Sequence, residues 1–440
     1  MSFPRYTKYR DSGFEWSGSI PEHWELKALK WIFQVIGGST PKSDVADYWD
    51  GTIVWLTPAD ISESRGQRVE HSERAITQAG LESCGTTLVP PESIVLSTRA
   101  PIGSLAIAGA TLCTNQGCKS LVAVEPANPG YFAYLLNACT EELNLRGRGT
   151  TFLELSADSL KSFEIIVPPI KEQDAIAAFL DRETAKMDAL IEEQKRLIEL
   201  LKEKRQAVIS QAVTKGLDPN VPMKDSGVEW LGEVPAHWQT MRLALLFKDA
   251  DERGNDDLPV LSVSIHDGVS NEELDEADME RKVTRSDDKT KYKRVQTGDL
   301  VYNMMRAWQG GFGSVTVEGM VSPAYVVARP RSELPTTYVE SLLRTPNAIE
   351  EMRSRSRGVT DFRLRLYWEE FREMVIPIPP KDEVESILAR LEKTTSETSD
   401  TISSAEDCIS ILQERRSALI SAAVTGKIDV RGLVPQAQAA

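Results

Sequence analysis

The chain is poor in the residues that enzymes use for metal centres and nucleophilic sites. Its 440 residues include only five cysteines and four histidines. The cysteines are odd in number and lack the paired spacing of a zinc site; they are Cys84, Cys113, Cys118, Cys139 and Cys408. We therefore expect free, buried thiols in a reducing compartment and no metal ion.

Long apolar runs are also missing. No stretch approaches the roughly 18 consecutive apolar residues of a membrane span. Residues 1–25 hold no apolar segment of the kind found in a secretory leader. We expect a cytoplasmic protein without a membrane segment. Its length favours two or three domains, each with its own core.

The common catalytic motifs are absent too. Thr425-Gly426-Lys427 is only a fragment of a phosphate-binding loop, because the preceding glycine is missing. Glu25-Leu26-Lys27 has the form of a nuclease motif but lacks a paired aspartate before it. His23 and His237 stand at matching positions between a proline and a tryptophan, which favours a fold-holding role. We expect no catalytic residue and no cofactor in this chain.

Charge is distributed unevenly. The formal net charge is −15, which is unusual for a simple nucleic-acid binder. Basic residues nevertheless gather at 281–294 and at 353–365, and a smaller pair stands at 146–148. Acidic residues concentrate at 271–280 and 192–203. Local basic patches therefore remain compatible with DNA binding.

What the chain does contain is a duplication. The motif D-S-G-x-E-W occurs at 11–16 and again at 225–230. The motif P-x-H-W occurs at 21–24 and again at 235–238. This offset is far longer than the 20–50 residues of a solenoid repeat, so it indicates two similar halves.

A long helix is predicted after each of two double prolines, Pro168-Pro169 and Pro379-Pro380. Proline is tolerated in the first turn of a helix but not in its interior. Gly216 marks a plausible end of the first helix. About 40 residues at 1.5 Å each would make a rod of roughly 60 Å.

Both helices carry an apolar seam of coiled-coil spacing. In the first, the seam is formed by Ile176, Leu180, Met187, Leu190, Leu197, Leu201 and Val208. In the second, it is formed by Ile387, Leu391, Ile402, Ile409, Leu412 and Leu419. Since such a seam cannot stay exposed, we expect the two helices to pack against each other in antiparallel directions as a spacer.

The two globular regions share a layout. In each, an apolar strand leads to an arginine (Arg99 or Arg306) and a glycine turn. A helix then follows, at 131–145 and at 338–353, and an Arg/Gly loop comes after it, at 146–151 and at 355–360. We predict a repeated box (1–30), a globular region (31–166), a central repeat with a long helix (167–240), a second globular region (241–376), a distal repeat with a long helix (377–430) and a flexible tail (431–440).

This layout resembles the specificity subunit of Type I restriction–modification systems. The repeated boxes and proline-started helices resemble that family's repeated regions, and the regions between them resemble its two target recognition domains. The segments at 55–60, 115–117 and 319–325 look like family motifs. The resemblance implies an α+β fold, with two recognition domains separated by an antiparallel coiled-coil spacer and a pseudo-two-fold internal repeat.

The resemblance also implies a function in the prokaryotic cytoplasm. One such subunit reads a bipartite, gapped site in double-stranded DNA, with one recognition domain on each half. It scaffolds two adenine methyltransferase (modification) subunits and the translocase–nuclease (restriction) subunits. S-adenosylmethionine, ATP and Mg would then belong to the partners.

Candidate DNA-binding residues follow from the chemistry of recognition. Arginine, lysine, asparagine and glutamine are the best readers of base edges, whereas phosphate contacts position a protein. The predicted base readers are Arg99, Asn115, Gln116, Lys119, Arg146, Arg148, Arg306, Arg355, Arg357 and Arg363. The predicted phosphate contacts are Lys42, Arg285, Lys289 and Lys291, with Thr150 and Thr360 as further backbone contacts.

Two alternatives stay open. A coiled-coil protein-interaction scaffold without nucleic-acid binding is favoured by the acidic balance and opposed by the clustered arginines of both regions. A single-chain methyltransferase would need cofactor and catalytic motifs that the sequence does not show.

Overall fold

The computed structural model describes residues 3–64, 68–99, 101–148, 153–255, 257–265, 268–271, 291–358 and 364–433. The chain forms two compact units. Unit 1 comprises Met1–Gln194 and Asp407–Ala440, and unit 2 comprises Lys195–Glu406. Each of the two long helices therefore contributes one segment to each unit.

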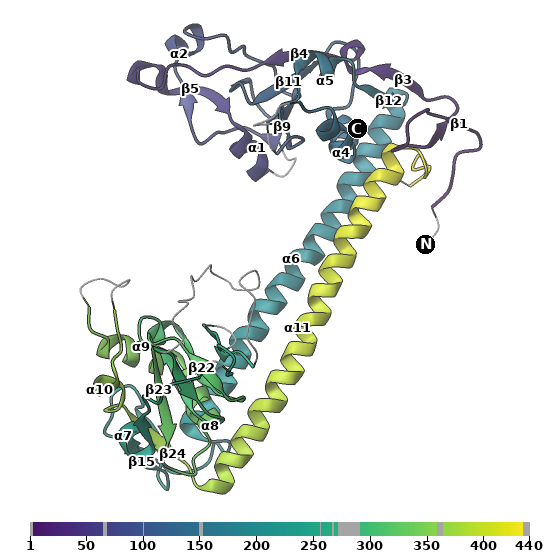
Figure 1. Cartoon of the computed structure of the whole chain (residues 1–440). Helices are drawn as coiled ribbons and strands as arrows, with labels where there is room; N and C mark the ends of the chain where they lie inside the picture. Colours follow the sequence, from purple (N-terminus) through teal and green to yellow (C-terminus); the bar gives the residue numbers. More distant parts are fainter. Residues whose placement is uncertain are drawn as a thin grey trace. The chain divides into compact units, whose positions relative to one another are not determined.

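Unit 1 is built on a five-stranded sheet and a three-stranded sheet (Figure 1). The first has the order β4 (Phe33–Gly37), β11 (Cys118–Ala123), β8 (Ile94–Ser97), β9 (Leu105–Ala108) and β6 (Arg68–Val69). The second has the order β10 (Leu112–Thr114), β5 (Trp49–Leu56) and β7 (Ala75–Ile76). Every residue of β8 and β9 is buried, as expected for apolar strands in the middle of a core.

Unit 2 repeats this plan with four strands in its main sheet among the described residues. Its main sheet has the order β16 (Phe247–Asp249), β23 (Tyr325–Pro330), β20 (Leu300–Asn303) and β21 (Phe312–Ser314). Two smaller pairs are β19 (Lys293–Val295) with β22 (Gly319–Val321), and β17 (Val263–Ser264) with β18 (Gly268–Val269).

The two main sheets share one strand register. In unit 1, Ile94 lies opposite Leu121 on one neighbouring strand and Ile107 on the other. In unit 2, Leu300 lies opposite Ala328 and Ser314 in the same way. Because a slip of one residue would turn every side chain to the other face, equal register shows that the halves are equivalent strand by strand.

The repeated box forms the same hairpin in each unit. It consists of β1 (Tyr9–Asp11) with β2 (Ser19–Pro21), and of β13 (Met223–Asp225) with β14 (Glu233–Pro235). A short antiparallel pair follows in each unit: β3 (Glu25–Ala28) with β12 (Glu164–Val167), and β15 (Gln239–Arg242) with β24 (Val375–Ile378). β12 and β24 lead directly into the double prolines.

The short helices lie between the strands. Unit 1 contains η1 (Leu29–Trp31), η2 (Ala46–Tyr48), α1 (Pro58–Ser64), α2 (Gln78–Glu82), α3 (Pro129–Ala138), α4 (Thr140–Leu145) and α5 (Ala157–Lys161). Unit 2 contains α7 (Leu243–Leu246), η4 (Ala307–Gln309), α8 (Thr336–Leu343), α9 (Pro346–Arg355) and α10 (Trp368–Phe371).

The single helices predicted at 131–145 and 338–353 are wrong, because each region folds as two helices. Cys139 separates α3 from α4 with a backbone outside the helical region (φ −97°, ψ 16°). Thr345 caps α9, and its hydroxyl accepts a hydrogen bond from Ala348 N at 3.4 Å. Pro346 then occupies the first position of α9, where its missing N–H costs nothing.

The two long helices, α6 (Ile170–Lys215) and α11 (Lys381–Val424), begin where the double prolines predict. They end beside glycines with left-handed backbones, Gly216 (φ +77°) and Gly426 (φ +72°). A side chain would be strained in that conformation, which makes glycine the usual residue after a helix. The predicted end at Gly216 is confirmed.

Part of the predicted seam of α6 is wrong by one residue. Ile191 and Ile198 are buried, whereas Leu190 is 51% exposed and Leu197 is 39% exposed. The buried register passes through Thr184, a polar residue whose hydroxyl donates to Leu180 O at 2.8 Å. A pattern of apolar residues cannot predict that a polar residue such as Thr184 is buried in the seam.

Within each unit, segments of α6 and α11 run side by side in opposite directions, as expected (Figure 1). In unit 1, the hydroxyl of Tyr131 donates to Ile166 O, just before α6, and to Val424 O, at the end of α11. In unit 2, Tyr338 makes the matching bonds to Pro377 O and Val213 O. Each tyrosine thus ties the start of one helix to the end of the other, and the α+β fold class is confirmed.

Candidate nucleic-acid interface

Three loops of unit 1 meet at the ends of its strands. Thr98 N donates to Gly117 O at 2.8 Å, which joins the end of β8 to the loop before β11. Ser39 N donates to Thr114 O at 3.0 Å, and the Thr40 hydroxyl donates to Gln116 Oε1. The loops at 37–42, 98–99 and 115–117 therefore form one continuous surface.

The Arg/Gly loop of unit 1 joins this surface. Arg148 and Glu154 exchange two backbone hydrogen bonds of 3.0 Å each, and Leu155 N donates to Thr98 O at 2.9 Å. Glu154 also forms an antiparallel β-bridge with Arg99, in addition to the one with Arg148. The structure thus brings four predicted base readers onto adjoining loops: Arg99, Asn115, Gln116 and Arg148.

The other predicted residues of unit 1 are more scattered. Lys119 lies on β11 opposite Gly37 and is half-buried. Lys42 has an exposed side chain, and its carbonyl accepts a hydrogen bond from Trp49 Nε1 at 3.1 Å. Arg146 packs 4.8 Å from the centre of the Phe163 ring. Thr150 lies outside the described residues.

Unit 2 assembles the same loops. Met304 N donates to Ala324 O at 3.4 Å, and Leu366 N donates to Met304 O at 2.8 Å. Arg357 and Arg365 exchange two backbone hydrogen bonds, as Arg148 and Glu154 do in unit 1. The segments at 303–306, 322–324, 357–358 and 364–366 therefore correspond to the unit 1 segments that carry Arg99, Gln116 and Arg148.

The sequence predicted that Arg99 and Arg306 are equivalent, and this prediction is wrong. The common register makes Met304 equivalent to Thr98, so Met305 and not Arg306 stands where Arg99 does. Arg306 lies one residue further, in a turn closed by a 2.9 Å bond from Gly311 N to Arg306 O. A 3-10 helix, η4, follows Arg306 in this turn, and Arg306 is its N-cap residue.

Of the remaining predicted residues in unit 2, Arg355 makes an ion pair within α9, at 2.5 Å from Glu351 Oε1. Arg357 contacts Glu370 through Nη2, and its side chain is 73% exposed. The carbonyl of Lys291 accepts from Arg253 Nη1 at 2.9 Å. Four further predicted residues lie outside the described part of the chain: Arg285, Lys289, Thr360 and Arg363.

Two glutamates on these surfaces were not among the residues predicted from the sequence. Glu154 Oε2 lies 3.3 Å from Arg99 Nε in unit 1. Glu370 Oε1 contacts Arg357 in unit 2. Glu154 stands beside the predicted Arg/Gly loop, so its position was a usable signal. Glu370 belongs to α10, and no local pattern links it to Arg357.

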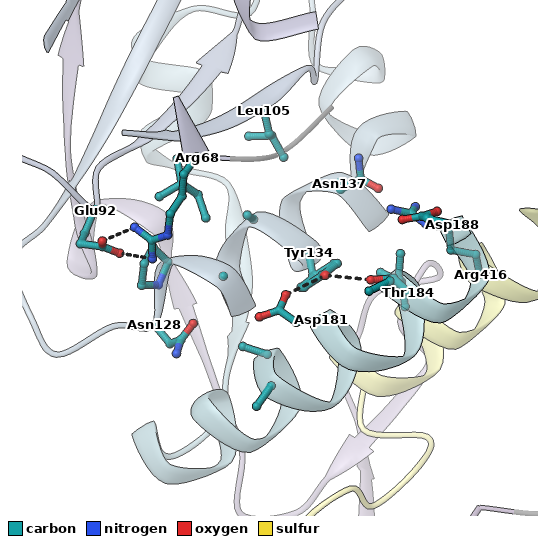
Figure 2. Close-up of a pocket in the computed structure, with 18 of the residues that line it drawn as sticks. Arg68, Glu92, Leu105, Asn128, Tyr134, Asn137, Asp181, Thr184, Asp188 and Arg416 are labelled. Atoms are coloured by element: carbon teal, nitrogen blue, oxygen red, sulfur yellow. Dashed lines mark hydrogen bonds and ion pairs between the residues drawn. The ribbon is translucent and has the colours of Figure 1, made fainter. Parts of the chain in front are cut away.

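A cavity of about 1200 Å³ in unit 1 lies between α3 and α6 (Figure 2). Its polar side chains bind one another: Tyr134 donates to Asp181 at 2.9 Å, and Asn128 donates to Asp174 at 2.8 Å. Arg416 of α11 pairs with Asp188 of α6 at 3.0 Å. The first two contacts attach the globular part of unit 1 to α6, and the third joins the two long helices.

The residues that resembled catalytic motifs have structural partners. Glu25 and Lys27 form an ion pair of 2.7 Å with each other on β3. His23 Nε2 lies 2.8 Å from Oε1 of Glu172, a residue of α6. His237 Nε2 contacts Oε1 of Glu383, a residue of α11, in the same way. Burial raises the pKa of Cys113 to about 11 and that of Cys118 to about 12, so both thiols are protonated at neutral pH.

The described residues offer neither a metal-binding cluster nor a membrane-spanning helix. No group of three or more histidine, cysteine, aspartate or glutamate side chains could hold a metal ion there. Among the same residues, no helix is long and apolar enough to cross a membrane.

Comparison with known proteins gives consistent matches. The family model of the Type I restriction modification DNA specificity domain matches residues 21–200. The Type I restriction enzyme MjaIX specificity subunit of Methanocaldococcus jannaschii is 33% identical over 237 residues, 52% of this chain and 53% of the relative. The EcoR124I/EcoR124II specificity subunit of Escherichia coli is 28% identical over 208 residues, 46% of this chain and 50% of the relative. The chain thus spans about half the length of the curated relatives it matches.

Two solved structures share the fold. The HsdS subunit from Thermoanaerobacter tengcongensis superposes with a TM-score of 0.55 at 15% identity, covering 95% of this chain and 100% of that one. A chain from a study of complex assembly and conformational transition of the type I R-M system gives a TM-score of 0.63 at 16% identity, covering 92% and 98%. The chain is therefore similar in sequence to Type I restriction–modification specificity subunits over about half of its length, and it shares their fold over nearly all of it.

Proposed function

We propose that this chain reads a bipartite, gapped site in double-stranded DNA, with one unit on each half-site. One observation carries the proposal: two main sheets of equal register present the same loops with different side chains. Asn115-Gln116-Gly117 in unit 1 occupies the place of Ser322-Pro323-Ala324 in unit 2. Equivalent loops with different donors and acceptors suit an asymmetric site, because base edges are read by such groups.

The chain would also scaffold its partners. Methyltransferase subunits would bring S-adenosylmethionine, and restriction subunits would bring ATP and Mg. Exposed apolar residues on the helix segments of unit 1 support a docking role, since Leu190 is 51% exposed and Ile411 is 63% exposed. The acidic balance of the chain then predicts weak DNA binding by the isolated subunit, with a strong dependence on salt.

The test is methylation in cells. The full chain is expressed with its neighbouring methyltransferase subunit, and adenine methylation is mapped by single-molecule sequencing with and without the chain. We expect a gapped, asymmetric motif with methyladenine in each half. A stable complex without new methylation would contradict DNA reading. Failure to form a complex would contradict scaffolding and favour a protein-interaction scaffold of another kind.

A further inference from the structure

Each unit places a carboxylate on the surface where DNA contacts are expected. In unit 1 it belongs to Glu154, which pairs with Arg99, and in unit 2 to Glu370, which pairs with Arg357. A carboxylate beside a phosphate backbone is unfavourable because the charges repel. Because both units have a glutamate on this surface, the glutamates need a role that offsets this repulsion.

In unit 1, backbone pairing fixes Glu154 between two arginines. It forms bridges to Arg99 on one side and Arg148 on the other. Residues directly opposite each other on adjacent antiparallel segments extend their side chains from the same face. Glu154 Oε2 lies 3.3 Å from Arg99 Nε, so this contact leaves the edge formed by Nη1 and Nη2 of the guanidinium for another partner.

In unit 2, the carboxylate is more buried than the arginine that it contacts. The Glu370 side chain is 14% exposed and the Arg357 side chain is 73% exposed. The second oxygen of Glu370 is buried and has no hydrogen-bond partner in the described part of the chain. Glu370 is therefore a fixed anchor, and Arg357 is the group presented to solvent.

The two pairs do not occupy equivalent positions in the two units. Arg365 occupies in unit 2 the backbone place that Glu154 has in unit 1. The glutamate of unit 2 comes instead from α10, outside the Arg/Gly loop. Each unit therefore contains an arginine paired with a glutamate, although residues at different positions form the two pairs.

Arginine recognises guanine through two parallel hydrogen bonds to O6 and N7, and this geometry requires an oriented guanidinium. A free arginine side chain has many rotamers, and ordering them on binding is unfavourable. A glutamate that already holds one edge removes part of this loss. It also leaves the N–H groups of the other guanidinium nitrogens for the base.

We propose that Glu154 and Glu370 are positioning residues that orient Arg99 and Arg357 to read a guanine, one in each half-site. The inference rests on the proposed function and specifies one base of each half. It follows that each half-site contains a G·C pair that the corresponding arginine contacts. A bidentate contact of this kind discriminates against a wrong base by roughly tenfold to a hundredfold.

The test uses the full chain in complex with its methyltransferase subunit. The methylated motif is determined first, and duplexes are then made in which each G·C pair of the motif is replaced singly. Competition binding measures the preference for the intact motif over each replacement, for the wild type and for Glu154→Gln and Glu370→Gln. We expect Glu154→Gln to lose about tenfold in discrimination at one G·C pair of one half-site. Glu370→Gln should do the same in the other half.

Matched controls separate positioning from charge. Glu92→Gln removes a carboxylate paired with Arg68 at similar exposure, on the β6 side of unit 1. Glu373→Gln removes one paired with Arg242 of β15 in unit 2. Both controls should keep full discrimination. Arg99→Lys and Arg357→Lys keep the positive charge but remove the forked guanidinium that forms two parallel hydrogen bonds. They should therefore lose discrimination at the same G·C pairs, and they test the proposal without changing the glutamates.

The outcomes are distinct. The positioning role would be overturned if the glutamine variants changed the affinity equally for all duplexes. It would also be overturned if the lysine variants kept the discrimination of the wild type. A half-site made only of A·T pairs would overturn it for that unit. A wild-type complex without any sequence preference would instead refute the proposed function.

Discussion

The two units hold their repeated box to a long helix through the same interaction, made with different strength. In unit 1, Glu172 of α6 accepts hydrogen bonds from Trp24 Nε1 at 3.0 Å and from the Tyr6 hydroxyl at 2.9 Å, and His23 lies 2.8 Å away. Arg431 adds a fourth contact at 3.8 Å. The Glu172 side chain is only 10% exposed.

In unit 2, Glu383 of α11 has a smaller set of partners. Trp238 Nε1 donates at 2.8 Å, and His237 lies 2.5 Å away. The Glu383 side chain is 36% exposed. The motif P-x-H-W thus has the same use twice, but the carboxylate of unit 1 is more buried and more heavily bonded.

Chain connectivity explains the difference. In unit 2, residues 216–222 link the end of α6 covalently to the hairpin that follows. In unit 1, the end of α11 and the first hairpin come from opposite ends of the sequence. Noncovalent contacts join them there: Tyr9 donates to Gly426 O at 3.1 Å, and Asp429 N donates to Pro4 O at 2.8 Å. A junction without a linker needs more contacts, because closing it costs more entropy.

The largest expected effect comes from removing the two carboxylates. Glu172→Ala leaves the Tyr6 hydroxyl and Trp24 Nε1 buried without partners, and each such group costs about 1–3 kcal/mol. We therefore expect the free energy of unfolding to fall by about 3 kcal/mol. Glu383→Ala should cost about 1–2 kcal/mol, because one buried donor is orphaned. Chemical unfolding with hydrogen exchange at 11–24 and 225–238 measures both. Glu22→Ala, at an exposed site, is the control. An equal decrease in the free energy of unfolding for both variants would show that the hydrogen bond from Tyr6 does not stabilise unit 1.

The glycines that end the helices give the next comparison. Alanine would be strained at both positions by about 1–2 kcal/mol, because φ is positive. At Gly426 the added carbon would also lie 2.4 Å from Pro21 Cδ, whereas at Gly216 the nearest atom is 3.3 Å away on Trp238. Gly426→Ala should therefore lower the unfolding temperature further than Gly216→Ala. Gly85→Ala, with open space around it, serves as control. A larger effect at Gly216 would contradict the tighter packing of unit 1.

The smallest expected effect is a pH dependence in unit 1. The hydrogen bond from Arg431 lowers the pKa of Asp429 below its usual value. A carboxylate with a lowered folded pKa stabilises above its unfolded pKa of about 3.9, and this contribution disappears as the pH falls through the folded pKa. Asp429→Asn should remove this acid-side loss, at a cost below about 1 kcal/mol at neutral pH. Thermal unfolding between pH 6 and about pH 3 measures it.

Asp218→Asn is the matched control in unit 2, because it makes the same change of charge in the covalent link. Its unfolding should keep the acid-side dependence of the wild type. If Asp429→Asn also kept that dependence, Asp429 would not contribute to the junction of unit 1.

Local rules predicted the frame of the molecule well. The double prolines placed the starts of α6 and α11, and Gly216 placed the end of α6, because these residues act through their own backbone. The packed positions were harder to predict. Thr184 completes the helix seam although it is polar, and Cys139 interrupts a segment that has good helical periodicity.

The site shows the same division between local and distant information. Arg99, Asn115, Gln116 and Arg148 were nominated by residue type, and the structure brings them onto adjoining loops. The equivalence of Arg99 with Met305 was visible only in the register of the sheets, because the turn after β20 is longer.

The sequence by itself determined that this protein is a duplication, with two boxes and two proline-started helices, since repeats and backbone preferences are written locally. The tertiary structure alone decided which donors surround Glu172 and Glu383 and which carboxylates reach Arg99 and Arg357. Those contacts join residues that are mostly far apart along the chain. Their distances depend on how strands, helices and loops pack together, and no local pattern of residues encodes that packing.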